Sequence, residues 1–457
     1  MQLTKKSERM GTEKIVPLLI KLSVPAIIGM SVQSLYNVVD SIYIGRVSKE
    51  ALAALSLAFP IQMVLIAIAV GTGVGTSSLI SRLLGESRIK NASNAARHVM
   101  IMTVFYGLAI GLVGFFFSEN IFSFVAEDPE LIKLGQEYIR IILLGSLAMF
   151  FPLIASDVLR GEGNTFIPML TLILGAVINI IIDPFLIFGI GFFPELGVAG
   201  AAYATIFSRF ISGLFIAWIL FKGDNQVKIR FEKFKFDFGI IIDVYKVGLP
   251  AMVMQFLASF MIFGVNRIVG SFDVLAIAVM GIYFRLQSFV FMPVFGLCQG
   301  FMPIVGYNFG HQKPARMKKT IKFGTLIAFA FTTSGFIIFQ AFPRQLISLF
   351  NNDPELIEIG VTALTRLSLA FPIIGPAIIG STTFQAIGKG LPSLIISFSR
   401  QIILLLPIMY LLGRFYGLDA LWYAFPLAEV LVFGVMVFWL KDTLEKTWEN
   451  MAGERAA

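Results

Sequence analysis

Long apolar runs separated by short polar segments form the main pattern of this sequence. A bilayer core about 30 Å thick is crossed by roughly 20 apolar residues of α-helix. The runs are continuous and lack the strict alternation of a barrel strand, so we predict an all-α integral membrane protein with twelve transmembrane helices. The predicted spans are residues 17–45, 53–80, 97–118, 136–159, 166–191, 197–221, 240–270, 274–306, 320–341, 358–386, 391–413 and 417–440.

The two halves of the chain repeat each other at an offset of about 225 residues. The stretch Asp128-Pro-Glu-Leu-Ile132 recurs identically at 353–357, and several glycines recur at the same offset, among them Gly85 and Gly310. Each half would hold six helices, an even number, so both halves enter the membrane in the same direction, as in transporters built from parallel repeats. We predict an N-terminal six-helix lobe (1–221), a cytoplasmic linker (222–239) and a C-terminal six-helix lobe (240–457), which together form two lobes.

Composition agrees with lipid as the solvent. Hydrophobic residues make up 57% of the chain and charged residues 14%, whereas soluble domains are about a quarter charged. The single cysteine, Cys298, excludes an intramolecular disulfide. The two histidines, His98 and His311, are too few for a His-rich metal cluster, and we expect both at the surface.

The net charge of +8 is distributed unevenly along the chain. Lys and Arg concentrate in the N-terminal tail and in the second, sixth and eighth loops, whereas opposite loops are acidic, as at Glu127-Asp128-Pro129-Glu130. The positive-inside rule then places both termini in the cytoplasm, and we expect a multi-pass protein of a prokaryotic inner membrane. The basic excess is explained by topology, so we expect no nucleic-acid partner.

The repeat fails at two buried acids. Asp40 falls in the first helix, where its counterpart is Val265, and Asp183 falls in the fifth, where the eleventh helix has no carboxylate. A charge at mid-membrane costs about 2.5–3.5 kcal/mol on insertion scales, so such residues are candidates for function. Only the N-terminal lobe is therefore predicted to carry an intramembrane acid pair.

Polar residues accompany both acids. Gln33, Tyr36 and Asp40 share one helical face by their spacing, with Asn37 at its edge. Asn179 and Asp183 share a face one turn apart. Pro184 has no N–H, so the carbonyl of Ile180 is left as a free acceptor.

Helix depth places these groups together. Counting from the ends of their helices, Asp40, Asn179, Asp183 and Thr205 all lie in the outer half of the bilayer, so we expect them around one cavity. Two acids in an apolar cavity disfavour carrying two charges at once, and such a pair can hold a proton as a coupled unit. The same oxygens could instead bind Na⁺. The alternative is that both carboxyl groups only form hydrogen bonds across helices and fix the packing.

The C-terminal lobe has its own intramembrane charges, Arg285, Arg400 and Glu429. We favour a structural ion network for them over contact with an anionic substrate. Asp157 is expected to reach the membrane surface. The run Gly71-Thr-Gly-Val-Gly75 lies in an apolar helix and is expected to pack against another helix. No GxxxxGK[ST], HExxH or GxSxG motif is present, so we predict no enzyme.

The sequence resembles the multidrug and toxic compound extrusion (MATE) family, most closely its DNA-damage-inducible F-like prokaryotic branch. The resemblance covers nearly the whole chain. Its local markers run from Pro25 and Gln33-Ser-Leu-Tyr-Asn-Val-Val-Asp40 through Leu159-Arg-Gly-Glu-Gly163 and Asn179-Ile-Ile-Ile-Asp-Pro184 to Gly197-Val-Ala-Gly-Ala-Ala-Tyr-Ala-Thr205. Two features depart from other branches: Gln255 stands where an acid is found in the seventh helix, and the fourth helix has Pro152, Leu153 and Ser156 instead of asparagines.

The resemblance implies a V-shaped pair of lobes. It implies export of cationic or amphipathic drugs and toxins, coupled to inward movement of H⁺ or Na⁺, without another cofactor. It also implies that helix 1 bends at Pro25, and that the N-lobe network consists of Asp40, Asn179, Asp183, Thr205, Tyr36 and Tyr138, with Gln33 and Asn37 alongside. We expect a monomer. The alternative function is a lipid-linked precursor flippase of the same wider superfamily.

Overall fold

The computed structural model describes residues 5–124, 128–191 and 193–456. Glu127, part of the predicted acidic loop, lies outside them. The N-terminal half is mostly helical, with short connections between its helices. It consists of α1 (Lys5–Thr12), α2 (Ile15–Val47), α3 (Lys49–Gly85), α4 (Ile89–Ser123), α5 (Pro129–Leu144), α6 (Ser146–Gly161), α7 (Phe166–Phe188) and α8 (Gly197–Lys222).

The second half follows the same order after a linker that contains only the short turn η1 (Phe231–Lys233). Its elements are α9 (Phe238–Val269), α10 (Val274–Gly310), α11 (Pro314–Ala341), α12 (Pro343–Ser348), α13 (Pro354–Leu367), η2 (Ser368–Ala370), α14 (Phe371–Ala386), α15 (Gly390–Phe398), η3 (Ser399–Leu405), α16 (Leu406–Leu421) and α17 (Ala424–Ala456).

The number of spans agrees with the prediction. Eleven segments of the described chain are long and apolar enough to cross a membrane, and α5 with α6 gives a twelfth if this bent pair is one span. The pair is bent by 50° at Gly145, which ends α5. The sequence predicted one unbroken helix over 136–159, and this part of the prediction was wrong because a glycine, which weakens helix continuation, lies in its middle.

The last span also begins later than predicted. Gly417 has φ 79° and ψ −176°, a backbone conformation open to glycine but not to other residues. The chain therefore turns there, and the final long helix starts at Ala424 instead of residue 417.

The repeated Asp-Pro-Glu-Leu-Ile stretch is a helix start in both halves. The Asp128 carboxylate accepts hydrogen bonds from the backbone N–H groups of Glu130 and Leu131, and Asp353 does the same for Glu355 and Leu356. The proline occupies the first helical turn, where its missing N–H costs nothing. The repeat thus fixes the starts of α5 and α13 in equivalent positions.

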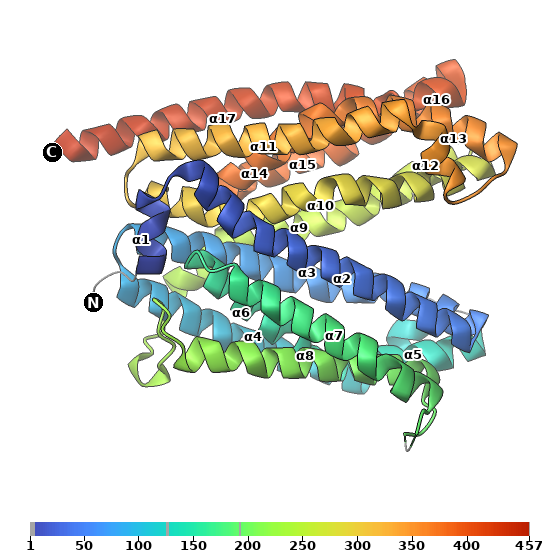
Figure 1. Cartoon of the computed structure of the whole chain (residues 1–457), viewed down its shortest axis with the longest axis horizontal. Helices are drawn as coiled ribbons and strands as arrows, with labels where there is room; N and C mark the ends of the chain where they lie inside the picture. Colours follow the sequence, from blue (N-terminus) through green and yellow to red (C-terminus); the bar gives the residue numbers. More distant parts are fainter. Residues whose placement is uncertain (1–4, 125–127, 192, 457) are drawn as a thin grey trace.

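The helices form two lobes that meet along one side (Figure 1). Helices α2–α8 make the lower lobe in that view and α9–α17 the upper one, and both termini and the linker lie at the left-hand end, here called the termini side. The lobes are joined mainly by α3 against α9, α2 against α10 and α3 against α10. Each lobe has its own apolar core.

Glycines bring the two lobes together on the termini side. A β carbon on Gly85 would overlap the carbonyl oxygen of Tyr307, and one on Gly310 would overlap that of Arg82. These two contacts are equivalent at the repeat offset, because 82 and 307 differ by 225, as do 85 and 310. Gly71 and Gly75 likewise approach Gly248 and Val244 of α9, which confirms packing as the role of the 71–75 run. We call the pair Gly85 and Gly310 the glycine contact.

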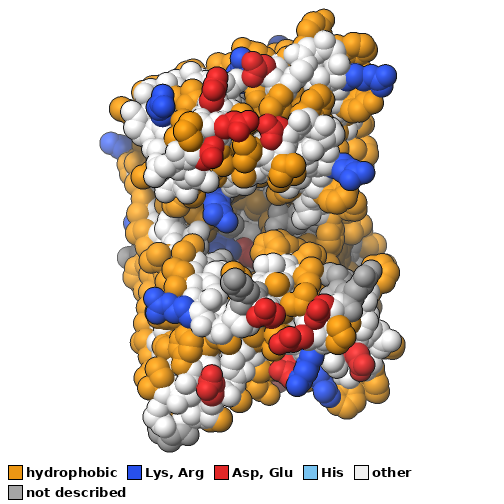
Figure 2. Space-filling model, turned by 90° about the vertical axis from the view of Figure 1, so that its right-hand side faces the viewer, with side chains coloured by type: hydrophobic (Ala, Val, Ile, Leu, Met, Phe, Trp, Pro, Cys, Tyr) orange, Lys and Arg blue, Asp and Glu red, His pale blue; other side chains and the backbone are white. Residues whose placement is uncertain are grey.

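At the opposite end the lobes separate. Figure 2 shows a hollow between them on that face, with acidic side chains on both of its rims. The molecule is therefore closed on the termini side and open on the other. Under the predicted topology, the open face is the extracellular one.

Candidate functional site

Asp183, the acid predicted in the fifth transmembrane helix, lies in α7 within the N-terminal lobe. Asp183 and Asn179 are both fully buried, and Asn179 Nδ2 donates a hydrogen bond to Asp183 Oδ1 at 3.2 Å. The helix continues through Pro184 to Phe188. One turn of α7 thus presents an amide and a carboxyl group side by side, as the sequence spacing predicted.

Asp40 of α2 reaches this carboxyl group. The carboxyl groups of Asp40 and Asp183 lie next to each other, and α2 packs along α7. A hydrogen bond between two carboxyl groups requires that one of them carries a proton, since an ionised carboxylate only accepts. Such a bond could form between these two groups only when one of them is protonated.

Three oxygens of this group are unsatisfied. Asp40 Oδ1, Asp183 Oδ2 and Asn179 Oδ1 are buried and have no hydrogen-bond partner among the described residues. Most buried polar atoms in proteins form hydrogen bonds, so three buried oxygens without a partner indicate a site that can bind a further group. An added proton or a hard cation such as Na⁺ would satisfy them, because hard cations prefer oxygen ligands.

Two tyrosines extend the group toward neighbouring helices. Tyr138 of α5 is buried, and its hydroxyl accepts a hydrogen bond at 3.3 Å from Nε2 of Gln62 in α3. The Tyr36 ring has the Arg209 guanidinium 6.0 Å from its centroid, and Gln33 lines the same small cavity as Tyr36 and Arg209. Sequence reasoning missed Gln62, although an amide inside an apolar run was a signal of the kind used for Asn179.

Other predicted members are less closely tied to the pair. Thr205 is buried on α8, which packs against α7. Asn37 is exposed, and its carbonyl accepts a hydrogen bond from Ser41. Pro25 lies inside α2, which runs from Ile15 to Val47 as one element, so a bend there stays a prediction.

Two expectations about polar residues on the termini side were wrong. Asp157 is only 8% exposed and pairs with Arg160 at 2.8 Å, against Gly73. His98 is 2% exposed, and its Nε2 accepts the backbone N–H of Asp237. The physical reason is that a partner covers each group: α3 closes over Asp157, and the linker folds over His98.

Of the three intramembrane charges predicted in the C-terminal lobe, two form an ion pair and the third lies apart from them. Arg400 Nη1 lies 3.5 Å from Glu429 Oε1, and Glu429 is buried. Arg285 is exposed and has no ion pair among the described residues. The structure joins two of the three residues predicted as a network and leaves Arg285 outside.

The Arg400–Glu429 pair gives a stability prediction. Changing Glu429 to Gln leaves Arg400 without a counter-charge and should cost about 3 kcal/mol, the lower end for breaking a buried pair, because Arg400 is 28% exposed. Thermal unfolding of the purified protein in detergent measures this as a lower Tm. Arg285→Gln is the matched control and should leave Tm unchanged; equal Tm values for both variants would contradict a structural role for the pair.

Comparison with known proteins places this geometry in context. A sequence profile of the MatE family matches residues 25–185 and 250–411. The chain is 28% identical over 430 residues to the FAD transporter of Shewanella oneidensis, covering 93% of this chain and 94% of that protein. It is 26% identical over 427 residues to the multidrug export protein MepA of Staphylococcus aureus, covering 92% and 93%.

A solved structure shares the whole fold. It is described as the outward-facing conformation of a multidrug resistance MATE family transporter, and it matches with a TM-score of 0.90, 29% identity and coverage of 98% of this chain and 99% of that one. The TM-score and the coverage show that the two proteins share the same overall fold. The chain belongs to the MatE family of membrane transporters.

Proposed function

We propose that this protein is an H⁺- or Na⁺-coupled antiporter that exports cationic or amphipathic compounds by alternating access. The observation that supports this most is the group Asp40, Asn179 and Asp183 in one lobe, in which each residue has one buried oxygen without a hydrogen-bond partner among the described residues. A site that gains stability by taking up a cation, and that loses it when the cation leaves, can exchange an ion for cargo.

The path from this site to the lobe interface runs along α2. Asp40 lies toward one end of that helix, and Ser23 lies toward the other, where its hydroxyl donates to the Leu297 carbonyl of α10 in the opposite lobe. A β carbon on Gly296 of α10 would overlap Ile27. Ion binding that changes how α2 packs against α7 therefore acts on a helix that also holds the two lobes together.

Transport in proteoliposomes tests the proposal. The purified protein is reconstituted, a cationic dye such as ethidium is added, and uptake is followed under an imposed H⁺ gradient, an Na⁺ gradient, or neither. We expect gradient-driven flux with one of the two ions. Equal flux with and without both gradients would refute ion coupling.

A second cargo class follows from one relative and one residue. The Shewanella relative is named an FAD transporter, and Arg285 offers an exposed cation without an ion pair among the described residues. An anionic dinucleotide is therefore the second candidate cargo. Labelled FAD in the same assay distinguishes the two classes, and Arg285→Gln should reduce FAD flux while leaving dye flux intact. Movement of a fluorescent lipid, measured in the same proteoliposomes, tests the alternative function as a lipid-linked precursor flippase.

A further inference from the structure

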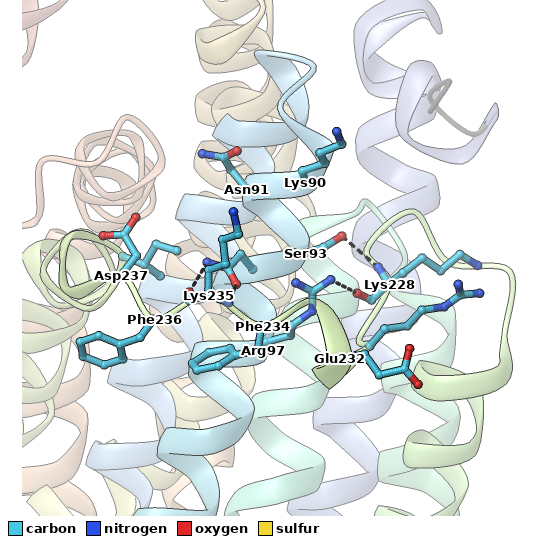
Figure 3. A pocket seen from close by; sticks show the side chains of 13 residues that line it. Lys90, Asn91, Ser93, Arg97, Lys228, Glu232, Phe234, Lys235, Phe236 and Asp237 are labelled. Atoms are coloured by element: carbon cyan, nitrogen blue, oxygen red, sulfur yellow. Dashed lines mark hydrogen bonds between the residues drawn. The ribbon is translucent and has the colours of Figure 1, made fainter.

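A hollow of about 980 Å³ lies on the termini side, outside the site described above. It is formed by the first turns of α4 and by the linker, and we call it the linker pocket. Figure 3 shows Lys90 and Asn91 on α4 together with Lys228, Lys235 and other linker residues around it. Both lobes contribute indirectly, because the linker leads from α8 into α9.

Side chains of α4 hold the linker in place. The Asn94 amide donates to the Lys235 carbonyl at 2.8 Å and accepts from the Lys235 N–H at 3.3 Å. Ser93 Oγ accepts from the Lys228 N–H at 3.1 Å (Figure 3). These bonds fix the linker backbone, so the pocket is formed in advance of any ligand.

The pocket is strongly basic. Five of its residues carry positive charge and two carry negative charge, Glu232 and Asp237; the positive ones are Lys90, Arg97, Lys228, Arg230 and Lys235. Lys90, Arg230 and Lys235 are exposed and form no ion pair with the described residues. Arg97 is buried at the base and donates to the Lys228 carbonyl at 3.3 Å. Arginine with several lysines is the composition that binds phosphate groups.

An apolar surface continues directly from the pocket. Ile101, Phe105, Leu108 and Leu112 follow Arg97 at intervals of four, four, three and four residues, so they lie on the same face of α4, and all four are exposed. Phe236, at the end of the linker, and Phe238, at the start of α9, are 70% and 61% exposed. A soluble phosphate has no apolar part that could contact this surface, whereas the acyl chains of a phospholipid can pack against it.

We propose that the linker pocket binds the phosphate headgroup of an anionic phospholipid, whose acyl chains lie along the exposed stripe of α4. Basic pockets between transmembrane helices on the cytoplasmic side are suited to such headgroups. The bound lipid would hold the linker against α4 and thereby restrain the connection between the lobes. This inference does not depend on which ion or cargo the transporter uses.

Lipid binding to the full chain in detergent tests the proposal. Dioleoyl phosphatidylglycerol, dioleoyl phosphatidylcholine and the water-soluble headgroup glycerophosphoglycerol are titrated separately, with Tm and retained lipid by native mass spectrometry as readouts. The pocket variant is Lys90→Ala, Arg230→Ala and Lys235→Ala combined. The matched control removes three exposed Lys charges elsewhere on the termini side, by Lys319→Ala, Lys322→Ala and Lys389→Ala.

We expect phosphatidylglycerol alone to raise Tm, and the pocket variant to bind it about a hundredfold more weakly, which corresponds to about 1 kcal/mol for each of three cations. The control variant should bind it like the wild type. Equal losses in both variants would show diffuse surface attraction and overturn the proposal. So would a Tm increase of the same size with glycerophosphoglycerol, which would indicate a soluble phosphate ligand instead of a lipid.

Discussion

Replacing Asp183 with Asn should reduce gradient-driven transport by at least tenfold, to the level of protein-free liposomes, and Asp40→Asn should do the same. The amide has nearly the shape of the carboxyl group but can neither take up a proton nor neutralise a cation. The hydrogen bond from Asn179 to Oδ1 can be kept in Asp183→Asn, so the fold should survive. Flux of a cationic dye under the driving gradient, measured on variants that elute as single species, is the readout.

The repeat supplies the control for this prediction. Glu429 is also a buried acid, but it belongs to the other lobe and is paired with Arg400. Glu429→Gln should lower stability yet keep the dependence of flux on the gradient. Wild-type flux in both aspartate variants, or loss of coupling in Glu429→Gln alone, would place the ion elsewhere.

Replacing Gly85 or Gly310 with Val should reduce transport by about tenfold for a different reason. Each new side chain would overlap a backbone carbonyl of the other lobe, and overpacking of this kind costs about 1–3 kcal/mol. That cost falls only on the state in which the glycine contact is closed. The population of the state open on the termini side should therefore rise, and the cycle should stall there.

Cysteine accessibility measures this shift. Ser78 is fully buried in α3, and its hydroxyl donates to the Gln385 carbonyl of α14 across the interface. In a Cys298→Ala background, Ser78→Cys should react with a hydrophilic maleimide at least tenfold faster when Gly85→Val is added. Gly281→Val in α10 is the control, because a β carbon there meets no atom within 4 Å. Equal labelling rates in the two valine variants would exclude the glycine contact as the closed gate.

The fold was largely predictable from the sequence because lipid imposes simple requirements. Apolar runs of bilayer length gave the spans, and matched stretches such as Asp128–Ile132 gave the two lobes, since each stretch starts an equivalent helix. The errors lie where one residue breaks a run: Gly145 divides a predicted span, and Gly417 delays the last helix. Backbone turns at single glycines leave the hydrophobic pattern unchanged, so the pattern could not reveal them.

The sequence predicted those parts of the site in which residues lie on the same helix, because their spacing fixes which face they share. The shared faces of Asn179 and Asp183 follow from a separation of four residues, and the failure of the repeat at Asp40 marked the partner helix. Contacts between distant helices, such as Gln62 with Tyr138 or Asp237 with His98, depend on packing that spacing does not specify. For the same reason the linker was predicted as a connection, although it folds over α4 and forms a pocket.

If the acid pair of the N-terminal lobe is the coupling site, as proposed, it limits the electrical work of each transport cycle. If the pair exchanges one proton for one monovalent cation, no net charge crosses the membrane, and the voltage contributes nothing. If it takes two protons for each cation, one charge moves inward, which adds about 2.3 kcal/mol of driving force for every 100 mV. If the proposed coupling holds, a voltage clamp across a planar bilayer distinguishes these two cases, because only the exchange of two protons for one cation carries a net current.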